Sequence, residues 1–106
     1  MGNRFMEVIC MFDLPVVTAR NRRAYRKFKK FLDDEGFSML EESVYNRMVP
    51  SGCPLEAVKN AFKKNRPPQG LVILLTVTEK QFENMVFVTG EHQSDVISGP
   101  DPVVVI

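Results

Sequence analysis

The sequence predicts one α+β domain in which a single antiparallel sheet carries two helices on one side. Short apolar segments typical of strands lie at 5–12, 37–49 and 71–77. Between them, two amphipathic segments at 18–35 and 54–65 have helical periodicity. The chain has 106 residues, of which 44% are hydrophobic and 25% charged, the size and balance of one globular domain.

The first strand is expected over residues 5–12, because proline at position 15 ends the ladder of hydrogen bonds soon afterwards. Side chains alternate between the two faces of a strand. One face is wholly apolar and should carry the helices: Met6, Val8, Cys10 and Phe12. The other face is mixed and is expected to meet a wetter surface or a partner subunit: Glu7, Ile9, Met11 and Asp13.

The first helix is predicted from an N-cap at Thr18 to about Glu35, with Gly36 ending it. Its apolar stripe faces the sheet and consists of Ala24, Tyr25, Phe28, Phe31 and Leu32. Pro54 can open the second helix, which should end near Asn65. The inner face of that helix comprises Leu55, Val58, Ala61 and Phe62.

The remaining segments complete a recognisable order. Residues 37–49 predict two strands with a turn near Glu41 and Glu42, and 71–77 predict a central strand. One helical turn is expected at 78–84, and short strands at 85–88 and 103–106. This is the ferredoxin-like βαββαβ sandwich with an extra C-terminal strand.

Covering only one side of the sheet leaves the other face bare, so we expect a homodimer through the sheet face. Residues 1–90 would form the ferredoxin-like domain. Residues 91–106 would form a C-terminal loop and a short strand that packs on the partner subunit.

Positive charge is concentrated in one segment of the chain. Residues 1–66 hold 13 Lys/Arg against eight Asp/Glu, whereas 67–106 hold one against five. Seven cations fall within eleven residues without an acid among them: Arg20, Arg22, Arg23, Arg26, Lys27, Lys29 and Lys30. Such a helix face is either simply solvated or a binding surface for phosphates, and the repulsion between like charges favours the second.

Asp13 is the acid best placed for chemistry, at the end of an apolar strand and before a proline-containing loop. A carboxylate there is a suitable ligand for Mg²⁺ or Mn²⁺, and in a two-fold dimer two copies of Asp13 could share one metal. The alternative is that Asp13 begins an Asx-type turn. Both interpretations stay open at this point.

Other site chemistries lack the residues that they need. The two cysteines, Cys10 and Cys53, form no CxxC pair, and His92 is the single histidine, so no tetrahedral zinc site is expected. Reduced thiols are expected. The longest apolar run has five residues, against the roughly 20 of a membrane span, and no secretory signal begins the chain. We therefore expect a cytoplasmic protein without membrane contact.

A set of residues spread over about positions 5 to 90 has a distinctive combination: Met11-Phe12-Asp13-Leu14-Pro15, Thr18, 23–32, Gly36-Phe37, Met39, Ser43-Val44-Tyr45 and 75–82. Taken together, these residues resemble the smaller CRISPR-associated spacer-adaptation proteins, the CRISPR-associated endoribonuclease family, in the form that accompanies single-protein RNA-guided effectors. Two positions depart from the pattern of similar sequences: Glu41 stands where Gln is frequent, and Arg20-Asn21 replaces an acidic pair.

The resemblance implies a homodimer in which Asp13 of both subunits flanks one Mg²⁺ or Mn²⁺ ion. It implies a magnesium-dependent phosphodiesterase acting on single-stranded RNA or double-stranded DNA. It further implies a scaffold that binds double-stranded DNA and joins the CRISPR integrase partner in spacer acquisition, a role that does not require cleavage. The cations expected to contact nucleic acid are Arg20, Arg22, Arg23, Arg26, Lys27 and Lys30.

A ligand-sensing ferredoxin-like regulatory module that does not bind nucleic acid is the alternative function. It predicts saturable binding of a small molecule, and the sequence has no glycine-rich loop of the kind that cradles phosphate.

Overall fold

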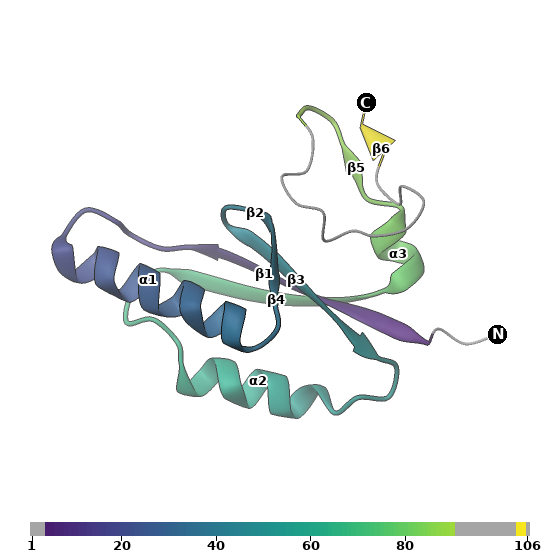
Figure 1. The fold of residues 1–106 in the computed structure, drawn as a ribbon, viewed down its shortest axis with the longest axis horizontal. Coiled ribbons are helices and arrows are strands. Elements are labelled where there is room, and N and C mark those ends of the chain that lie inside the picture. The colour runs from purple at the N-terminus through teal and green to yellow at the C-terminus, as the bar shows by residue number, and fades with distance from the viewer. Residues whose placement is uncertain (1–3, 91–103, 106) are drawn as a thin grey trace.

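The computed structural model describes residues 4–90 and 104–105. A four-stranded sheet carries two long helices, and a small pair of strands lies beside it (Figure 1). In chain order the elements are β1 (Phe5–Asp13), α1 (Ala19–Asp34), β2 (Ser38–Glu41), β3 (Val44–Pro50), α2 (Leu55–Lys64), β4 (Leu71–Thr78), α3 (Glu79–Glu83), β5 (Val86–Phe87) and β6 (Val104–Val105).

The main sheet has the strand order β2-β3-β1-β4, and every neighbouring pair is antiparallel. This confirms the α+β class and the ferredoxin-like arrangement. The prediction that residues 71–77 form a central strand is wrong: in the described part of the chain β4 pairs with β1 alone. Its apolar sequence reflects two apolar faces, since the face of β4 turned away from the helices is hydrophobic as well.

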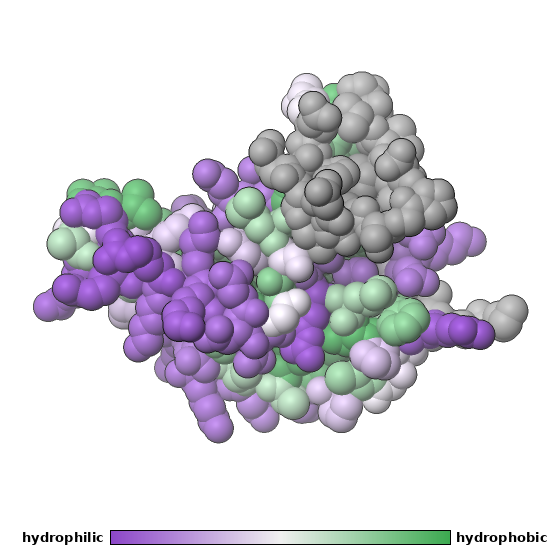
Figure 2. All heavy atoms as spheres, viewed as in Figure 1, coloured by the Kyte–Doolittle hydropathy of each residue, from purple (hydrophilic) through white to green (hydrophobic). Residues whose placement is uncertain are grey.

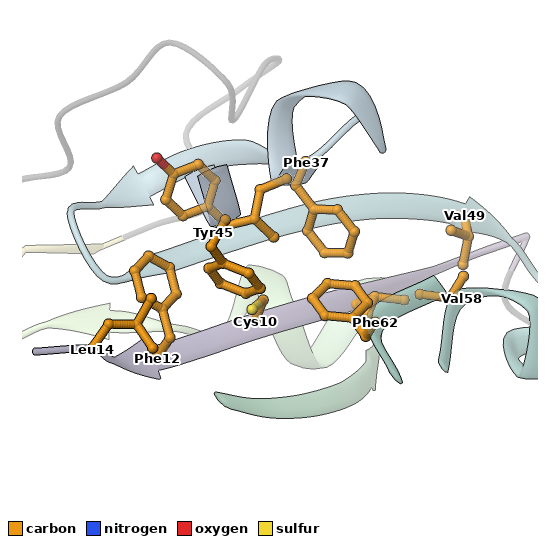
Figure 3. Close-up of a cluster of buried hydrophobic side chains, with 11 residues drawn as sticks. Cys10, Phe12, Leu14, Phe37, Tyr45, Val49, Val58 and Phe62 are labelled. Atoms are coloured by element: carbon orange, nitrogen blue, oxygen red, sulfur yellow. The ribbon is translucent and has the colours of Figure 1, made fainter. Parts of the chain in front are cut away.

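β1 is the central strand, and its two faces separate as alternation predicts. Val8, Cys10 and Phe12 are buried in the core beneath the helices, with exposed fractions of 6% or less. The core lies between the sheet and the helices, as the close-up of buried side chains shows (Figure 3). The predicted helix-facing set on β1 is therefore confirmed.

Aromatic rings join the two helices to the sheet. Phe12 of β1 contacts Phe28 of α1 edge-on, with ring centroids 5.2 Å apart. Phe62 of α2 packs against Phe31 at 5.0 Å and against Phe37 at 5.5 Å, both at nearly right angles. Edge-to-face pairs of this kind add a directional contribution to the burial of apolar area. They fix how α1 and α2 lie on the sheet.

The ends of α1 follow the expected chemistry. The Thr18 hydroxyl accepts a hydrogen bond from the Asn21 amide nitrogen at 3.0 Å, and the Asn21 side chain accepts one from the Thr18 nitrogen at 3.2 Å. The two bonds form a capping box, which satisfies the first backbone groups of the helix. At the other end Gly36 has φ +82°, the left-handed conformation that ends helices.

The outer face of the sheet, on the side away from α1 and α2, is largely apolar and exposed. Leu71, Ile73 and Leu75 of β4 are 57%, 43% and 47% exposed, and Met48 of β3 is 53% exposed. By their register the residues of this outer face include Glu7, Ile9, Met11, Asp13, Val44, Asn46, Met48, Leu71, Ile73, Leu75 and Val77. The bare face expected from the sequence is present at Leu71, Ile73, Leu75 and Met48, whereas Glu7 and Asn46 of the same face are buried.

The sequence predicted that Glu7 meets a wetter surface or a partner subunit. In the structure Glu7 is buried, with only 5% of its surface exposed. Asn46 of β3, equally buried, donates a hydrogen bond from Nδ2 to Glu7 Oε1 at 3.0 Å. Burial raises the pKa of Glu7, the Asn46 hydrogen bond opposes this, and the nearby Glu79 of α3 raises the pKa further. Asn46 Oδ1 has no hydrogen-bond partner among the residues described.

Residues near the C-terminus form a second, two-stranded sheet in which β5 and β6 run parallel. The predicted short strand at 85–88 is thus present as β5, and the helical turn at 78–84 is present as α3. Residues 91–103 and 106, which include most of the predicted C-terminal loop, lie outside the described residues. Packing of 91–106 on a partner subunit stays a prediction.

We predict that Glu7→Gln stabilises the protein at neutral pH. A glutamine amide can accept from Asn46 Nδ2 and donate back to Asn46 Oδ1, which removes a buried charge and pairs an unpartnered oxygen. The expected gain in the free energy of unfolding is about 1 kcal/mol, the net worth of one hydrogen bond. Urea unfolding at pH 7 measures it, with the exposed Glu83→Gln as the control.

The gain should depend on pH in a defined direction. Because the folded state raises the pKa of Glu7 above its ordinary value of 4.5, the folded wild type holds this proton more tightly than the unfolded chain. The Glu7 contribution to wild-type stability therefore falls as the pH rises through the folded-state pKa. The difference between wild type and Glu7→Gln should shrink below pH 4.5. A variant less stable than wild type at pH 7 would contradict this account.

Candidate metal and nucleic-acid interface

Asp13 is the last residue of β1, and its side chain is exposed at the rim of the outer face. It lies opposite Leu71 in the register between β1 and β4. Within the part of the chain that the structure describes, its carboxylate accepts no hydrogen bond, so nothing supports the alternative of an Asx-type turn. The carboxylate oxygens of Asp13 are open to a ligand from solution.

The backbone around Asp13 contacts the β2–β3 turn on one side and Gly70 on the other. The Phe12 nitrogen donates a hydrogen bond to the Ser43 carbonyl oxygen in the β2–β3 turn at 3.0 Å. On the other side Gly70 approaches so closely that a Cβ atom built there would lie 2.6 Å from the Asp13 carbonyl oxygen and 2.8 Å from a Leu14 methyl carbon. With φ +98°, Gly70 also has a conformation that other residues rarely adopt.

Gly70 is the residue of this site that the sequence analysis missed. The available signal was its place between a Pro-Pro-Gln segment and a β-branched run, where a glycine indicates a close backbone approach.

A metal at Asp13 would need ligands from beyond one chain. The described residues contain no cluster of three or more His, Cys, Asp or Glu side chains that could hold a metal ion. Mg²⁺ takes one or two carboxylates and completes its octahedron with water and phosphate oxygens, so a single exposed Asp is a compatible first ligand. Glu41 and Glu42, at the β2–β3 turn, are both exposed.

The cysteine residues do not contribute to the site. Burial raises the pKa of the Cys10 thiol to about 12, so it stays protonated and unreactive at neutral pH. Cys53 is a free, half-buried thiol before α2. His92 lies outside the described residues.

Three of the seven cations on α1 have partners within the chain. Arg22 donates from Nη1 to the carbonyl oxygens of Val16 and Val17, at 3.2 and 2.9 Å, and so braces the loop that follows Asp13. Lys29 lies 5.4 Å from the centre of the Tyr25 ring. Lys30 pairs with Asp34 at 3.2 Å on the exposed side of the helix.

The other four cations are exposed, and no described residue forms an ion pair with them: Arg20, Arg23, Arg26 and Lys27. Hydrophilic side chains cover α1 in the space-filling view (Figure 2). The surface of α1 therefore carries uncompensated positive charge at these four positions. Within the predicted set, Arg22 and Lys30 are the two whose charged groups are already engaged.

The family model of CRISPR associated protein Cas2 matches residues 6–85, which include all of β1 except Phe5, both long helices and β4. A search for membrane spans found no helix of sufficient length and apolarity among the described residues.

Curated relatives match along almost their whole length. A protein of Treponema denticola is 41% identical over 101 residues, which cover 95% of this chain and all of the relative. One from Streptococcus mutans serotype c is 42% identical over 93% of this chain and 91% of the relative. A third, from Lacticaseibacillus rhamnosus, is 39% identical over 95% of this chain and all of the relative. Each is named CRISPR-associated endoribonuclease Cas2, and with the family match they show that this chain belongs to the CRISPR associated protein Cas2 family.

Proposed function

We propose that this protein is a dimeric scaffold that binds double-stranded DNA and joins the CRISPR integrase partner during spacer acquisition. The observation that carries the proposal is the row of exposed, unpaired cations on α1, in a member of a CRISPR-associated family. Contacts with phosphates give affinity without sequence preference, which suits a protein that must accept DNA of any sequence.

The outer face of the sheet supports a dimer. Exposed Leu, Ile and Met side chains gathered on one face of a small domain form the kind of apolar patch that marks an interaction site. A two-fold interface lets one self-complementary surface cover both copies. Asp13 lies at the rim of the same face, so a two-fold axis that passes near this rim would bring the two Asp13 carboxylates toward one another.

We predict that Leu75→Glu converts the protein from a dimer to a monomer. Leu75 is 47% exposed on the outer face, opposite Ile9, and a charge there would be buried without a partner in the interface. Gel filtration with light scattering measures the mass, first alone and then with the integrase partner and a short duplex. The variant should also fail to co-elute with that partner. Val88→Glu, at an exposed position after β5, is the matched control.

Either of two outcomes would contradict the dimer proposal. One is a wild-type protein that elutes as a monomer at every concentration tested. The other is a Leu75→Glu variant that remains dimeric, since the outer face would then not be the interface.

We predict that Arg23→Ala/Arg26→Ala weakens duplex binding equally for all sequences. Each lost phosphate contact lowers the slope of log affinity against log salt by about 0.9, so the double variant should lower it by about two. Fluorescence anisotropy with two unrelated duplexes measures the slope. The control is Arg4→Ala/Lys80→Ala, which removes two exposed cations outside α1. Wild-type binding that does not respond to salt would overturn the scaffold proposal.

A second candidate function is metal-dependent cleavage of a phosphodiester, favoured by the open Asp13 carboxylate and by the relatives' printed name, endoribonuclease. Bound Mg²⁺ or Mn²⁺ would polarise the scissile phosphate and lower the pKa of an attacking water. Asp13 would hold the ion, with Asp13 of a second copy as a further ligand. Gly70 allows the chain to approach the Asp13 backbone closely, because it has no Cβ atom. Arg22 donates hydrogen bonds to the loop that follows Asp13.

We predict that Asp13→Asn abolishes metal-dependent cleavage of single-stranded RNA or duplex DNA and leaves duplex binding intact. The amide is a weaker ligand than the carboxylate for a hard divalent cation. Gel assays with Mg²⁺, with Mn²⁺ and with EDTA measure cleavage, and anisotropy measures binding. Glu42→Gln, an exposed acid on the β2–β3 turn, is the control. Cleavage that persists in Asp13→Asn or in EDTA would rule out this mechanism.

A further inference from the structure

Three hollows lie on the helix side of the sheet, beside α1 and the segment from α2 to β4. The first, of about 250 Å³, is lined by Arg20, Tyr25 and Gln69 among others. The second, of about 110 Å³, is lined by Lys27, Lys64 and Arg66. The third, of about 360 Å³, is lined by Lys59, Lys63 and Arg66.

The hollows are neighbours, because they share lining residues. Ala24, Pro67 and Pro68 line both the first and the second. Phe28 and Arg66 line both the second and the third. Together they form one surface, here named the basic track, whose cations are Arg20, Lys27, Lys64, Arg66, Lys63 and Lys59.

The charge of the basic track is of one sign. All six cations are exposed, and no Asp or Glu lines any of the three hollows. Of these six cations, only Lys59 has an ion-pair partner among the described residues, Glu56 at 3.4 Å. Lys63 and Lys64 lie in the last turn of α2, where positive charge stabilises a helix by interacting with its dipole, so their presence has a structural explanation. The dipole of α2 does not explain the presence of Lys27, which belongs to α1, or of Arg66, which lies beyond the end of α2.

We propose that the basic track binds the sugar-phosphate backbone of a nucleic-acid strand, with one phosphate seated between Lys27, Lys64 and Arg66. Three cations around a small hollow suit a group that carries several acceptor oxygens, and the Arg66 guanidinium can bind two of them at once. This inference rests on the proposed nucleic-acid binding and extends it beyond α1 to the end of α2 and the segment after it.

The position of the basic track is compatible with the proposed dimer. The third hollow is lined by Val72 and Leu74, which pack against the core on the helix side of β4, whereas Ile73 and Leu75 between and beside them face the outer side. Hydrophilic side chains continue from α1 toward α2 in the space-filling view (Figure 2). A nucleic acid on the basic track would therefore leave the outer face free for a second copy.

Lys64→Ala/Arg66→Ala tests the proposal. Neither side chain belongs to α1, and both are exposed, so the fold should be kept, which circular dichroism can verify. The salt slope of duplex binding should fall by about two relative to wild type. Arg4→Ala/Lys80→Ala removes the same charge from positions that line none of the three hollows and should leave the slope near that of wild type. A Lys64→Arg variant should retain wild-type binding.

The outcomes separate this inference from the function on which it rests. If wild type binds duplex with a steep salt slope and Lys64→Ala/Arg66→Ala has the same slope, the basic track is not a nucleic-acid surface, while the proposal for α1 stands. If the same variant keeps duplex binding but loses binding to poly-glutamate, the track serves an acidic polypeptide and the inference fails. If wild type shows no salt-dependent duplex binding, both proposals fail together.

Discussion

The two-sided pairing of β1 is the constraint on which the rest of the structure depends. β1 pairs with β3 from Phe5 to Met11 and with β4 from Met6 to Asp13, so almost its whole length is fixed by hydrogen bonds on both edges. A slip of one residue would exchange its two faces and expose Val8, Cys10 and Phe12 to water. The same register that buries these side chains also places Asp13 at the rim of the outer face.

The elements that could be predicted are those governed by local chemistry. Thr18 and Gly36 bound α1 because a hydroxyl cap and a left-handed glycine act within a few residues of the chain. The alternation of buried and less buried side chains along β1 could also be predicted, because burial of one face of a strand imposes a period of two residues. The position of β4 at the edge of the sheet could not be predicted from the sequence. An apolar run indicates that both faces of a strand avoid water, and it carries no information about how many strands lie beside it.

In the candidate site, too, the features that could be predicted are those visible in the local sequence. Asp13 and the cations of α1 were visible as charged residues in distinctive settings, and the structure leaves Asp13, Arg20, Arg23, Arg26 and Lys27 exposed. The partners of Arg22 and Lys30 and the role of Gly70 depend on distances between atoms that a sequence does not contain. Lys64 and Arg66 were overlooked for a similar reason, since they gain significance only where α2 ends beside Lys27.

One edge of β4 pairs with no strand in the described part of the chain, and the composition of β4 has a consequence for the solubility of the newly made chain. Residues 71–78 contain neither charge nor proline, the two devices with which edge strands usually resist pairing with other molecules. About sixty residues separate this strand from its partner β1 in the sequence, so the chain is largely synthesised before the two can meet. Until that pairing forms, 71–78 is a segment prone to intermolecular β-aggregation. High expression should therefore favour inclusion bodies, and a slower rate of synthesis should favour native protein.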